Sequence, residues 1–223
     1  MKNISNEWDN ASKEWIDCVE INHYRKNILI PETLKMLGKV KGKKLIDIGC
    51  GEGGYSRLLA EKGACVVGVD YSQELINEAI KRKATYDIQY YVKDACYLEG
   101  IENEYFDLAI STMCLIAFED LQSAMKELYR VLKPGGECVI SILHPCFTRE
   151  DYFSEGAYTE SLSQFFGKPI TFWHKTLSKT INYMIKAGFK LELLSEPILD
   201  NKNTNRKDDK FSTPMFLLVK LKK

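Results

Sequence analysis

The sequence lacks any long apolar run, since none of its hydrophobic stretches approaches the ~18 residues that a membrane-spanning helix needs. Its first eighteen residues are polar and include Glu7, Asp9, Glu14 and Asp17, so we expect no signal peptide there. Neither sign of charge is in excess, because 31 Lys and Arg residues balance 31 Asp and Glu residues. We therefore expect neither a membrane partner nor the basic surface on which non-specific nucleic-acid binding depends.

Cysteine patterns that bind metal or form a disulfide framework are also missing. The seven cysteines are odd in number and none stands in a C-x-x-C pair, so the sequence predicts neither a zinc knuckle nor any other metal site. A chain of 223 residues, 45% of them hydrophobic, is long enough for one large globular domain. We expect a reduced, soluble, cytoplasmic protein whose oligomeric state the sequence leaves open.

The first forty residues have the periodicity of helices. Trp8, Ala11, Trp15 and Cys18 recur at spacings of three and four, and a second apolar set follows a break near Pro31. We interpret residues 1–43 as an N-terminal helical cap.

From Lys44 the pattern changes to short apolar runs that alternate with amphipathic helices. The runs cover residues 45–48, 64–69, 88–92, 106–111 and 137–143. Strands that alternate with helices of ten to fifteen residues predict a mostly parallel sheet with both faces covered. Residues 44–143 are therefore the expected core of an α/β fold.

The rest of the chain divides into an irregular segment and a regular end. Residues 145–173 are rich in aromatics without a clear period, and we interpret residues 144–176 as a lid or insertion. A helix is expected to begin at Thr176 or Ser178. Two later runs, residues 189–194 and 215–221, predict an antiparallel hairpin on either side of an exposed loop over residues 201–210, within a closing segment 177–223.

The most informative stretch is LIDIGCGEGG, residues 45–54, in which a strand meets glycines and then a helix. Gly49, Gly51 and Gly54 fit the dinucleotide pattern G-x-G-x-x-G, and Asp70 lies where a ribose-binding acid is expected, so an NAD-dependent oxidoreductase is one candidate. Asp47 favours a different ligand, because a carboxylate beside the loop repels a pyrophosphate and attracts a cationic amino group. No Lys-Ser or Lys-Thr follows the glycines, which excludes a P-loop.

Three carboxylates, on Asp47, Asp70 and Asp94, stand at the ends of successive expected strands. Each has a purely structural alternative. Asp47 could be a favourable charge at a helix N-terminus, Asp70 could cap the helix that begins near Ser72, and Asp94 could be a turn residue. Together they lie at the carboxyl edge of the sheet, where open α/β folds bind their ligands. The combination predicts a ligand site there.

Four motifs in this order, LIDIGCGEGGYSRLLAEKGACVVGVDYS, VKDACYL, FDLAISTMCL and VLKPGGECVISI, resemble the class I S-adenosylmethionine-dependent methyltransferases, in particular the small-molecule group. The resemblance covers roughly residues 24–196. It implies a Rossmann-like, doubly wound, seven-stranded sheet and S-adenosylmethionine as cofactor, with S-adenosylhomocysteine as product. It also implies EC 2.1.1 activity on a small-molecule acceptor; a non-catalytic protein that binds S-adenosylmethionine or S-adenosylhomocysteine is the remaining alternative.

The resemblance implies a role for each matching residue. The residues expected to hold the methionine part of the cofactor are Asp47, Gly49, Cys50, Gly51 and Gly53, with Ser111 and Thr112 beside the reaction centre. Asp70 is expected to accept the ribose hydroxyls, Tyr71 to lie against the adenine, and Asp94 and Ala95 to bind the adenine edge. Tyr24 and Arg25 match the cap that similar enzymes fold over the cofactor.

Methyl transfer needs a base only when the acceptor must lose a proton. His144, just after the fifth expected strand, is the better-placed candidate, and a hydrogen-bonded loop histidine is its alternative. His174 is the weaker candidate. Aromatic residues between Phe147 and Trp173 are expected either to line an acceptor pocket or to form the core of the lid.

Overall fold

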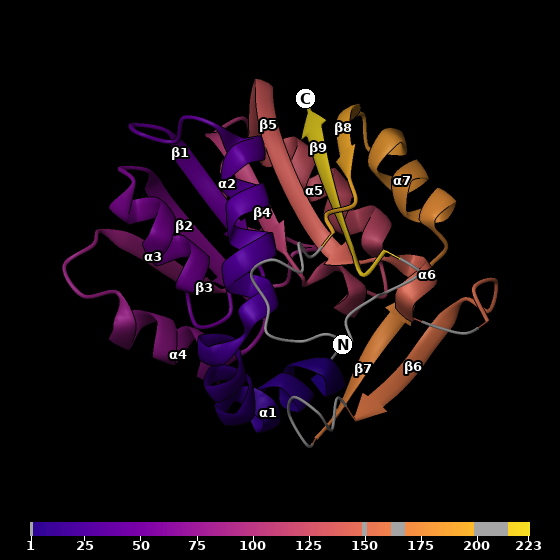
Figure 1. The fold of residues 1–223 in the computed structure, drawn as a ribbon. Helices are drawn as coiled ribbons and strands as arrows, with labels where there is room; N and C mark the ends of the chain where they lie inside the picture. The colour runs from indigo at the N-terminus through magenta and orange to yellow at the C-terminus, as the bar shows by residue number, and fades with distance from the viewer. Residues whose placement is uncertain (1, 149–150, 162–167, 199–213) are drawn as a thin grey trace.

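The computed structural model describes residues 2–148, 151–161, 168–198 and 214–223, and its centre is a seven-stranded sheet in the order β3-β2-β1-β4-β5-β9-β8 (Figure 1). The strands are β1 Lys44–Ile48, β2 Cys65–Asp70, β3 Ile88–Val92, β4 Phe106–Thr112, β5 Leu132–Leu143, β8 Lys190–Ser195 and β9 Phe216–Lys222. The first five are parallel, whereas β9 is antiparallel to both β5 and β8. This confirms the predicted Rossmann-like fold with an antiparallel hairpin. The antiparallel end counts against the oxidoreductase alternative, which predicts a sheet without one.

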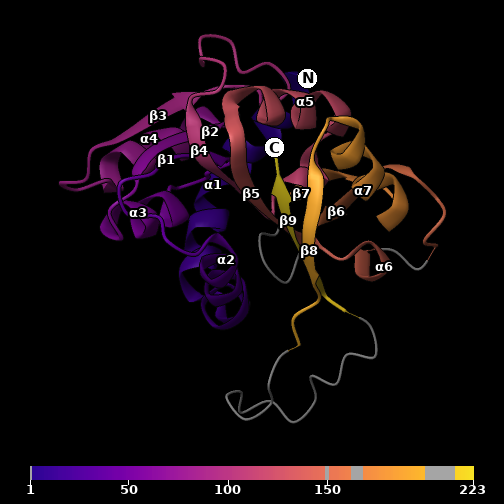
Figure 2. The same ribbon diagram turned by 90° about the horizontal axis from the view of Figure 1, so that it is seen from above.

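Helices cover the two faces of this sheet in separate layers, as Figure 2 shows from above. One layer consists of α2 Ile30–Leu37, α3 Gly54–Glu61 and α4 Gln73–Arg82, and the other of α5 Leu121–Val131 and α7 Leu177–Lys186. Alternation along β1 assigns its side chains to the two cores: Leu45 belongs to the α2–α4 side, and Ile46 and Ile48 to the α5–α7 side. Asp47 therefore points to the same face as Leu45, under α3.

The residues interpreted as an N-terminal cap form α1 Lys2–Ile21, a π-helical turn Arg25–Leu29 and α2. The predicted break near Pro31 is wrong in position: α1 ends ahead of Asn22, whose Oδ1 accepts the Arg25 N–H at 3.0 Å. Pro31 lies in the first turn of α2, which continues directly from the π-helical turn.

The segment predicted to be irregular, residues 145–173, contains regular structure. A short helix, α6 Pro145–Thr148, precedes an antiparallel pair, β6 Gly156–Ser161 and β7 Pro169–His174. Alternate β7 side chains, Ile170 and Phe172, are buried against Ala11 of α1, so two segments far apart in sequence form one small core. The alternation in β7 was the available signal, and the surrounding aromatic residues obscured it. The predicted 201–210 loop and Phe165 and Phe166 lie outside the described residues.

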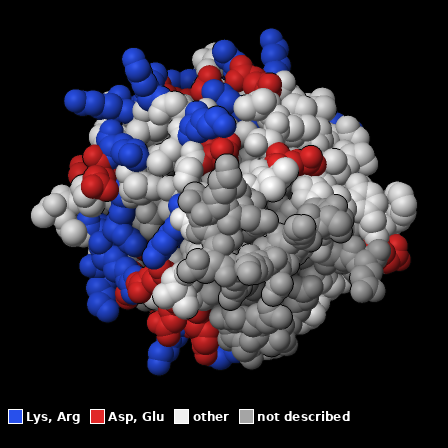
Figure 3. All heavy atoms as spheres, viewed as in Figure 1, with Lys and Arg blue, Asp and Glu red and all other residues white. Residues whose placement is uncertain are grey.

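Charges on the surface are mixed. On the face shown in Figure 3, Lys and Arg side chains are mixed with Asp and Glu side chains over the part of the surface that the structure describes. Several form ion pairs, including Lys220 with Glu137 at 2.9 Å and Lys133 with Asp107 at 2.7 Å. Within the described ranges, no helix has both the length and the apolar character that a membrane crossing demands.

Candidate functional site

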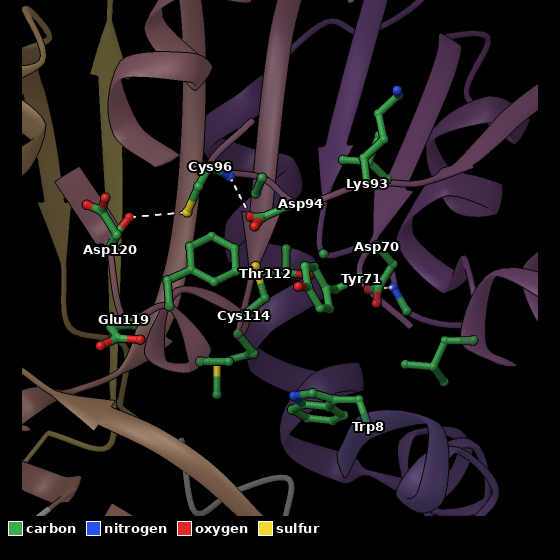
Figure 4. A pocket seen from close by; sticks show the side chains of 18 of the residues that line it. Trp8, Asp70, Tyr71, Lys93, Asp94, Cys96, Thr112, Cys114, Glu119 and Asp120 are labelled. Carbon is green, nitrogen blue, oxygen red and sulfur yellow. Dashed lines mark hydrogen bonds between the residues drawn. The ribbon is translucent and has the colours of Figure 1, made fainter. Parts of the chain in front are cut away.

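A cavity of about 460 Å³ opens at the carboxyl ends of β1 to β4, within the usual range for small-molecule sites (Figure 4). Each of these strands contributes through the loop that follows it: Gly49 and Gly51 after β1, Asp70 and Tyr71 at the end of β2, Asp94 and Ala95 after β3, and Thr112 at the end of β4. The chain leaves β1 toward β2 on one side and β4 occupies the other side. This switch in strand order is where open α/β sheets bind ligands.

Gly49 and Gly53 occupy positions of the glycine loop where a larger residue would be strained. Gly49 has φ +69°, and a Cβ there would overlap the Cys114 side chain. Gly53 has φ +77° directly before α3, and a Cβ there would overlap the Tyr90 hydroxyl. The loop is fixed on its other side by the N–H groups of Gly49 and Cys50, which donate to the Val69 carbonyl at 2.8 and 3.0 Å.

Asp70 joins the loop to the next helix. Its Oδ2 accepts the Gly51 N–H at 2.8 Å and its Oδ1 accepts the Ser72 N–H at 2.9 Å, while the Ser72 side chain caps α4 by accepting from Leu75. Burial raises the pKa of Asp70, and the backbone donors from Ser72 and Gly51 oppose that effect. The carboxylate thus has a structural role, and it also lies on the cavity wall.

Asp94 and its neighbours form the next part of the wall. The Asp94 Oδ1 accepts the Cys96 N–H at 2.8 Å, as a turn residue does, and Cys96 Sγ donates to the Asp120 carbonyl at 3.3 Å (Figure 4). Ala95 and Tyr71 line the cavity as well. The structural alternative for Asp94 is therefore present together with the cavity position.

Asp47 is fully buried under α3 and does not line the cavity. Its Oδ2 accepts the Ser56 Oγ–H at 2.6 Å, but its Oδ1 has no hydrogen-bond partner among the described residues. Burial raises the pKa of Asp47 to about 7, against the opposing effect of the Ser56 hydrogen bond. An under-satisfied buried carboxylate behind a glycine loop is an uncommon arrangement that needs an explanation.

Arg25 lies behind the same loop and outside the cavity lining. Its guanidinium pairs with Glu52 at 3.1 Å and lies 5.3 Å from the centre of the Tyr55 ring. It also occupies the space that a Cβ on Gly54 would need, which explains the third glycine of the G-x-G-x-x-G pattern without a dinucleotide. Arg25 thus packs against the side of the glycine loop that faces away from the cavity.

Other expected site residues also lie outside the lining. Cys50 and Gly53 belong to the loop but face the protein interior, where the Cys50 sulfur lies beside Gly68. Ser111 is buried, with its Oγ 2.8 Å from Cys114 Sγ, and Tyr24 packs against Phe216.

His144 was expected near an acceptor and instead lies apart from the cavity lining. It is buried, with Nδ1 directed at Cys146 and Nε2 3.0 Å from Glu196 Oε1. His174 is also buried, and its Nε2 lies 2.8 Å from the Tyr152 carbonyl. The described structure thus shows His144 in its hydrogen-bonded alternative, and His174 beside a backbone carbonyl and outside the cavity lining.

The sequence interpretation missed the aromatic wall that α1 supplies. Trp8 and Trp15 line the cavity with their rings 5.4 Å apart, and Phe118 and Tyr97 add to it from the loops. The seven-residue spacing of the two tryptophans on an amphipathic helix was the available signal. None of the described aromatic residues of the 145–173 segment lines it; Phe172, for example, packs behind Trp8 at 6.4 Å.

Comparisons with known proteins agree with this geometry. A family profile described as a methyltransferase domain matches residues 46–140. An S-adenosylmethionine-dependent methyltransferase of Mesorhizobium loti has a structure that is 28% identical, with a TM-score of 0.76 over 86% of this chain and 96% of that one. Structures this similar over nearly their whole length share a fold.

Two curated relatives are O-methyltransferases. The malonyl-[acyl-carrier protein] O-methyltransferase of Enterobacter lignolyticus is 33% identical over 45% of this chain and 39% of its own. The ubiquinone biosynthesis O-methyltransferase of Pseudomonas entomophila is 28% identical over 63% of this chain and 60% of its own. The match thus spans less than two thirds of either relative. The cavity at the strand switch, the glycine loop and these similarities place the chain in the class I S-adenosylmethionine-dependent methyltransferase family, with S-adenosylmethionine as its cofactor.

Proposed function

We propose that this chain transfers a methyl group from S-adenosylmethionine to a small-molecule acceptor, within the EC 2.1.1 class. The observation that carries the proposal is the cavity, which brings Asp70, Asp94 and the glycine loop to one edge of the sheet. The cofactor supplies a methyl group already activated on a sulfonium. The protein's share of the work is therefore to align the acceptor and exclude water.

The residues around the cavity fit the cofactor in charge and hydrogen-bonding capacity. A carboxylate offers about four lone-pair sites, and two backbone N–H groups use only part of the capacity of Asp70. We assign the remainder to the ribose hydroxyls. Asp94, the Ala95 backbone and the Tyr71 ring are assigned to the adenine, and Thr112 to the methionine part.

Asp47 is assigned to the amino group of the cofactor, acting as a charge behind the loop with Gly49, Cys50, Gly51 and Gly53. Its unpartnered Oδ1 supports this assignment, because a nearby cation offsets the cost of burying the ionised carboxylate. Further support roles go to the residues behind the lining: Ser111 positions the loop after β4, and Tyr24 and Arg25 brace the cap.

We assign the acceptor to the part of the cavity beside Trp8, Met113 and Phe118. Because His144 does not line the cavity, it is not assigned as a base for an acceptor bound there; the carboxylates of Glu119 and Asp120 do line the cavity. Mixed surface charge favours a small acceptor over a nucleic acid. In this proposal residues 1–43 and 144–176 cover the site, 44–143 bind the cofactor and 177–223 complete the sheet. Seven free thiols fit the proposed cytoplasmic setting.

The test begins with calorimetric titration of S-adenosylhomocysteine into the wild type and Asp70→Asn. The substitution keeps the shape but removes the charge and one acceptor, and we expect affinity to fall by about tenfold or more. Asp107→Asn is the matched control, because Asp107 also accepts a backbone N–H, from Lys44 at 2.9 Å, and does not line the cavity. Equal affinity in the wild type and Asp70→Asn, or no binding by the folded wild type, contradicts the proposal.

Activity is then measured as release of S-adenosylhomocysteine with amine, phenol, thiol and carboxylate acceptors. Release with any of them supports an enzyme. Tight cofactor binding without release across the whole panel supports the non-catalytic alternative instead.

A further inference from the structure

Three side chains away from the cavity form a thiol–imidazole–carboxylate array, which we call the Cys146 cluster: Cys146, His144 and Glu196. Cys146 is in α6, His144 directly follows β5, and Glu196 directly follows β8. The Cys146 Sγ lies 2.7 Å from His144 Nδ1, and His144 Nε2 lies 3.0 Å from Glu196 Oε1. The second contact is close but lacks the alignment of a hydrogen bond, so we treat it as electrostatic. This order of groups is the one that activates a nucleophile.

The protonation state of His144 follows from a backbone contact. The Cys146 N–H can only donate, and it points to His144 Nδ1 at 3.2 Å. Nδ1 must therefore be the unprotonated nitrogen of the neutral ring, and the proton resides on Nε2, which faces Glu196. The Cys146 S–H then donates to Nδ1, so the nitrogen nearest the thiol is also the one able to take its proton.

The histidine is held in place and neutral. The backbone N–H of His144 donates to the Met215 carbonyl at 2.8 Å, and the backbone carbonyl of His144 accepts the Phe147 N–H at 2.8 Å. Its side chain is 3% exposed, and burial lowers its pKa while Glu196 opposes that effect. A neutral imidazole can accept a proton.

Cys146 is reachable from solvent, unlike the histidine. Of the seven cysteines only Cys146 and Cys65 are exposed. Cys65, at the start of β2, forms no side-chain hydrogen bond to any described residue, whereas Cys146 has an imidazole in contact. None of the three residues of the Cys146 cluster lines the cofactor cavity, so the array does not depend on the proposed function.

We propose that the Cys146 cluster is a second reactive site, at which Cys146 exchanges with small disulfides. His144 Nδ1 takes the thiol proton, and the Cys146 sulfur attacks one sulfur of the disulfide. A new bond forms between Cys146 Sγ and that sulfur as the original S–S bond breaks. The leaving thiolate receives the proton from His144, so Cys146 is oxidised to a mixed disulfide and one half of the reagent is reduced to a thiol. Glu196 stabilises the imidazolium during the exchange.

The test compares the two exposed cysteines within one molecule. The reduced full-length protein is treated with 2-hydroxyethyl disulfide, a neutral probe, and modification of each cysteine is followed over time by peptide mass spectrometry. We expect Cys146 to react about fivefold or more faster than Cys65. His144→Gln can still accept a hydrogen bond but cannot take the proton, so the rate ratio should fall close to one.

Two partly exposed carboxylates, on Glu196 and Glu192, provide a variant and its control. Glu196→Gln should lower the ratio about twofold or more, since it removes the charge that faces His144. Glu192→Gln should leave the ratio unchanged, because Glu192 faces Lys220 and Lys222 on β9. If His144→Gln fails to fold, the comparison of Glu196→Gln with Glu192→Gln still tests the proposal.

A wild-type ratio near one, or a ratio that neither His144→Gln nor Glu196→Gln lowers, overturns the proposal. Parallel treatment with iodoacetamide separates nucleophilicity from disulfide exchange. Fast alkylation of Cys146 with slow disulfide exchange overturns the assignment of disulfides as its substrate class.

Discussion

Replacing Asp47 by asparagine removes a buried charge whose cost the structure makes measurable. The carboxylate is fully buried, accepts one hydrogen bond from Ser56 and leaves Oδ1 unpartnered among the described residues. Burial raises its pKa from 3.8 to about 7. At 1.36 kcal/mol per unit, ionised Asp47 costs the folded state about 4 kcal/mol relative to the unfolded chain.

The direction of the pH effect follows from where the proton binds. Between about pH 4 and pH 7 the folded state holds a proton on Asp47 that the unfolded chain has lost, so stability falls as pH rises through this window. Between about pH 5 and pH 8 this one group should remove about 2–3 kcal/mol from the free energy of unfolding. Asparagine is neutral at both pH values and lacks this loss.

The assay is thermal unfolding of the cofactor-free protein at about pH 5 and pH 8. The Tm of Asp47→Asn relative to wild type should rise by about 5–10 °C from the lower to the higher pH, given a chain of this length. Asp107→Asn is the opposite control: burial raises the pKa of Asp107, but Lys133 and the Lys44 N–H outweigh that effect and hold it low. That variant should therefore be less stable than the wild type by about the same amount at both pH values, because Asp107 is ionised in the folded and the unfolded chain across this window.

Cofactor binding should respond to Asp47→Asn in the opposite sense. If the carboxylate faces the cationic amino group, the more stable variant should bind S-adenosylhomocysteine about fivefold or more weakly at pH 8. Identical pH dependence of Tm in wild type and Asp47→Asn would refute the assignment of a raised pKa. Unchanged affinity would refute the role at the amino group.

Two further predictions concern the loop and the aromatic wall. Gly49→Ala should destabilise the protein by about 1–3 kcal/mol in urea unfolding, because the alanine would have a positive φ and its Cβ would overlap the Cys114 side chain. Gly135 also has a positive φ but no close neighbour, so Gly135→Ala should cost less. Equal costs for the two variants would contradict the overlap. S-adenosylhomocysteine should change tryptophan fluorescence through Trp8 and Trp15, and the response should shrink in Trp8→Phe; an unchanged response in that variant would remove α1 from the site.

The regular strands of the sheet could be predicted because their signals are local. The bounds of β3, Ile88–Val92, match the predicted run, and α5 begins after Asp120, whose Oδ1 accepts the Ser123 N–H as an N-cap. Helix and strand periods are written within about ten residues of sequence. Most strand bounds therefore came within a residue or two of the structure.

The remaining contacts are between residues distant in sequence, which periodicity does not report. Arg25 could be assigned to the cap from its motif position, but its pairing with Glu52 depends on how the π-helical turn meets the glycine loop. His144 could be placed at the end of a strand, but Glu196 reaches it from the far side of the hairpin. Charge and residue type were enough to select Arg25 and His144 as candidate site residues. Their partners depend on how distant segments pack, which the sequence does not report.

The contact between α1 and β7 has a consequence for the order in which this chain matures. Glu7 accepts the Thr171 N–H at 2.8 Å across 164 residues, so this contact can form only after β7 has been synthesised, whereas the hydrogen bonds from Ser72 and Glu74 to Asp9 need only the first half of the chain. Strands β1 to β4 all lie in the first half of the chain and can pair while the ribosome is still extending it. During that interval α1 can already contact α4, but the partner of Trp8 on β7, Phe172, has not yet been synthesised. The aromatic packing behind Trp8 is therefore completed only once β7 has been made, after the strands that carry the glycine loop and Asp70.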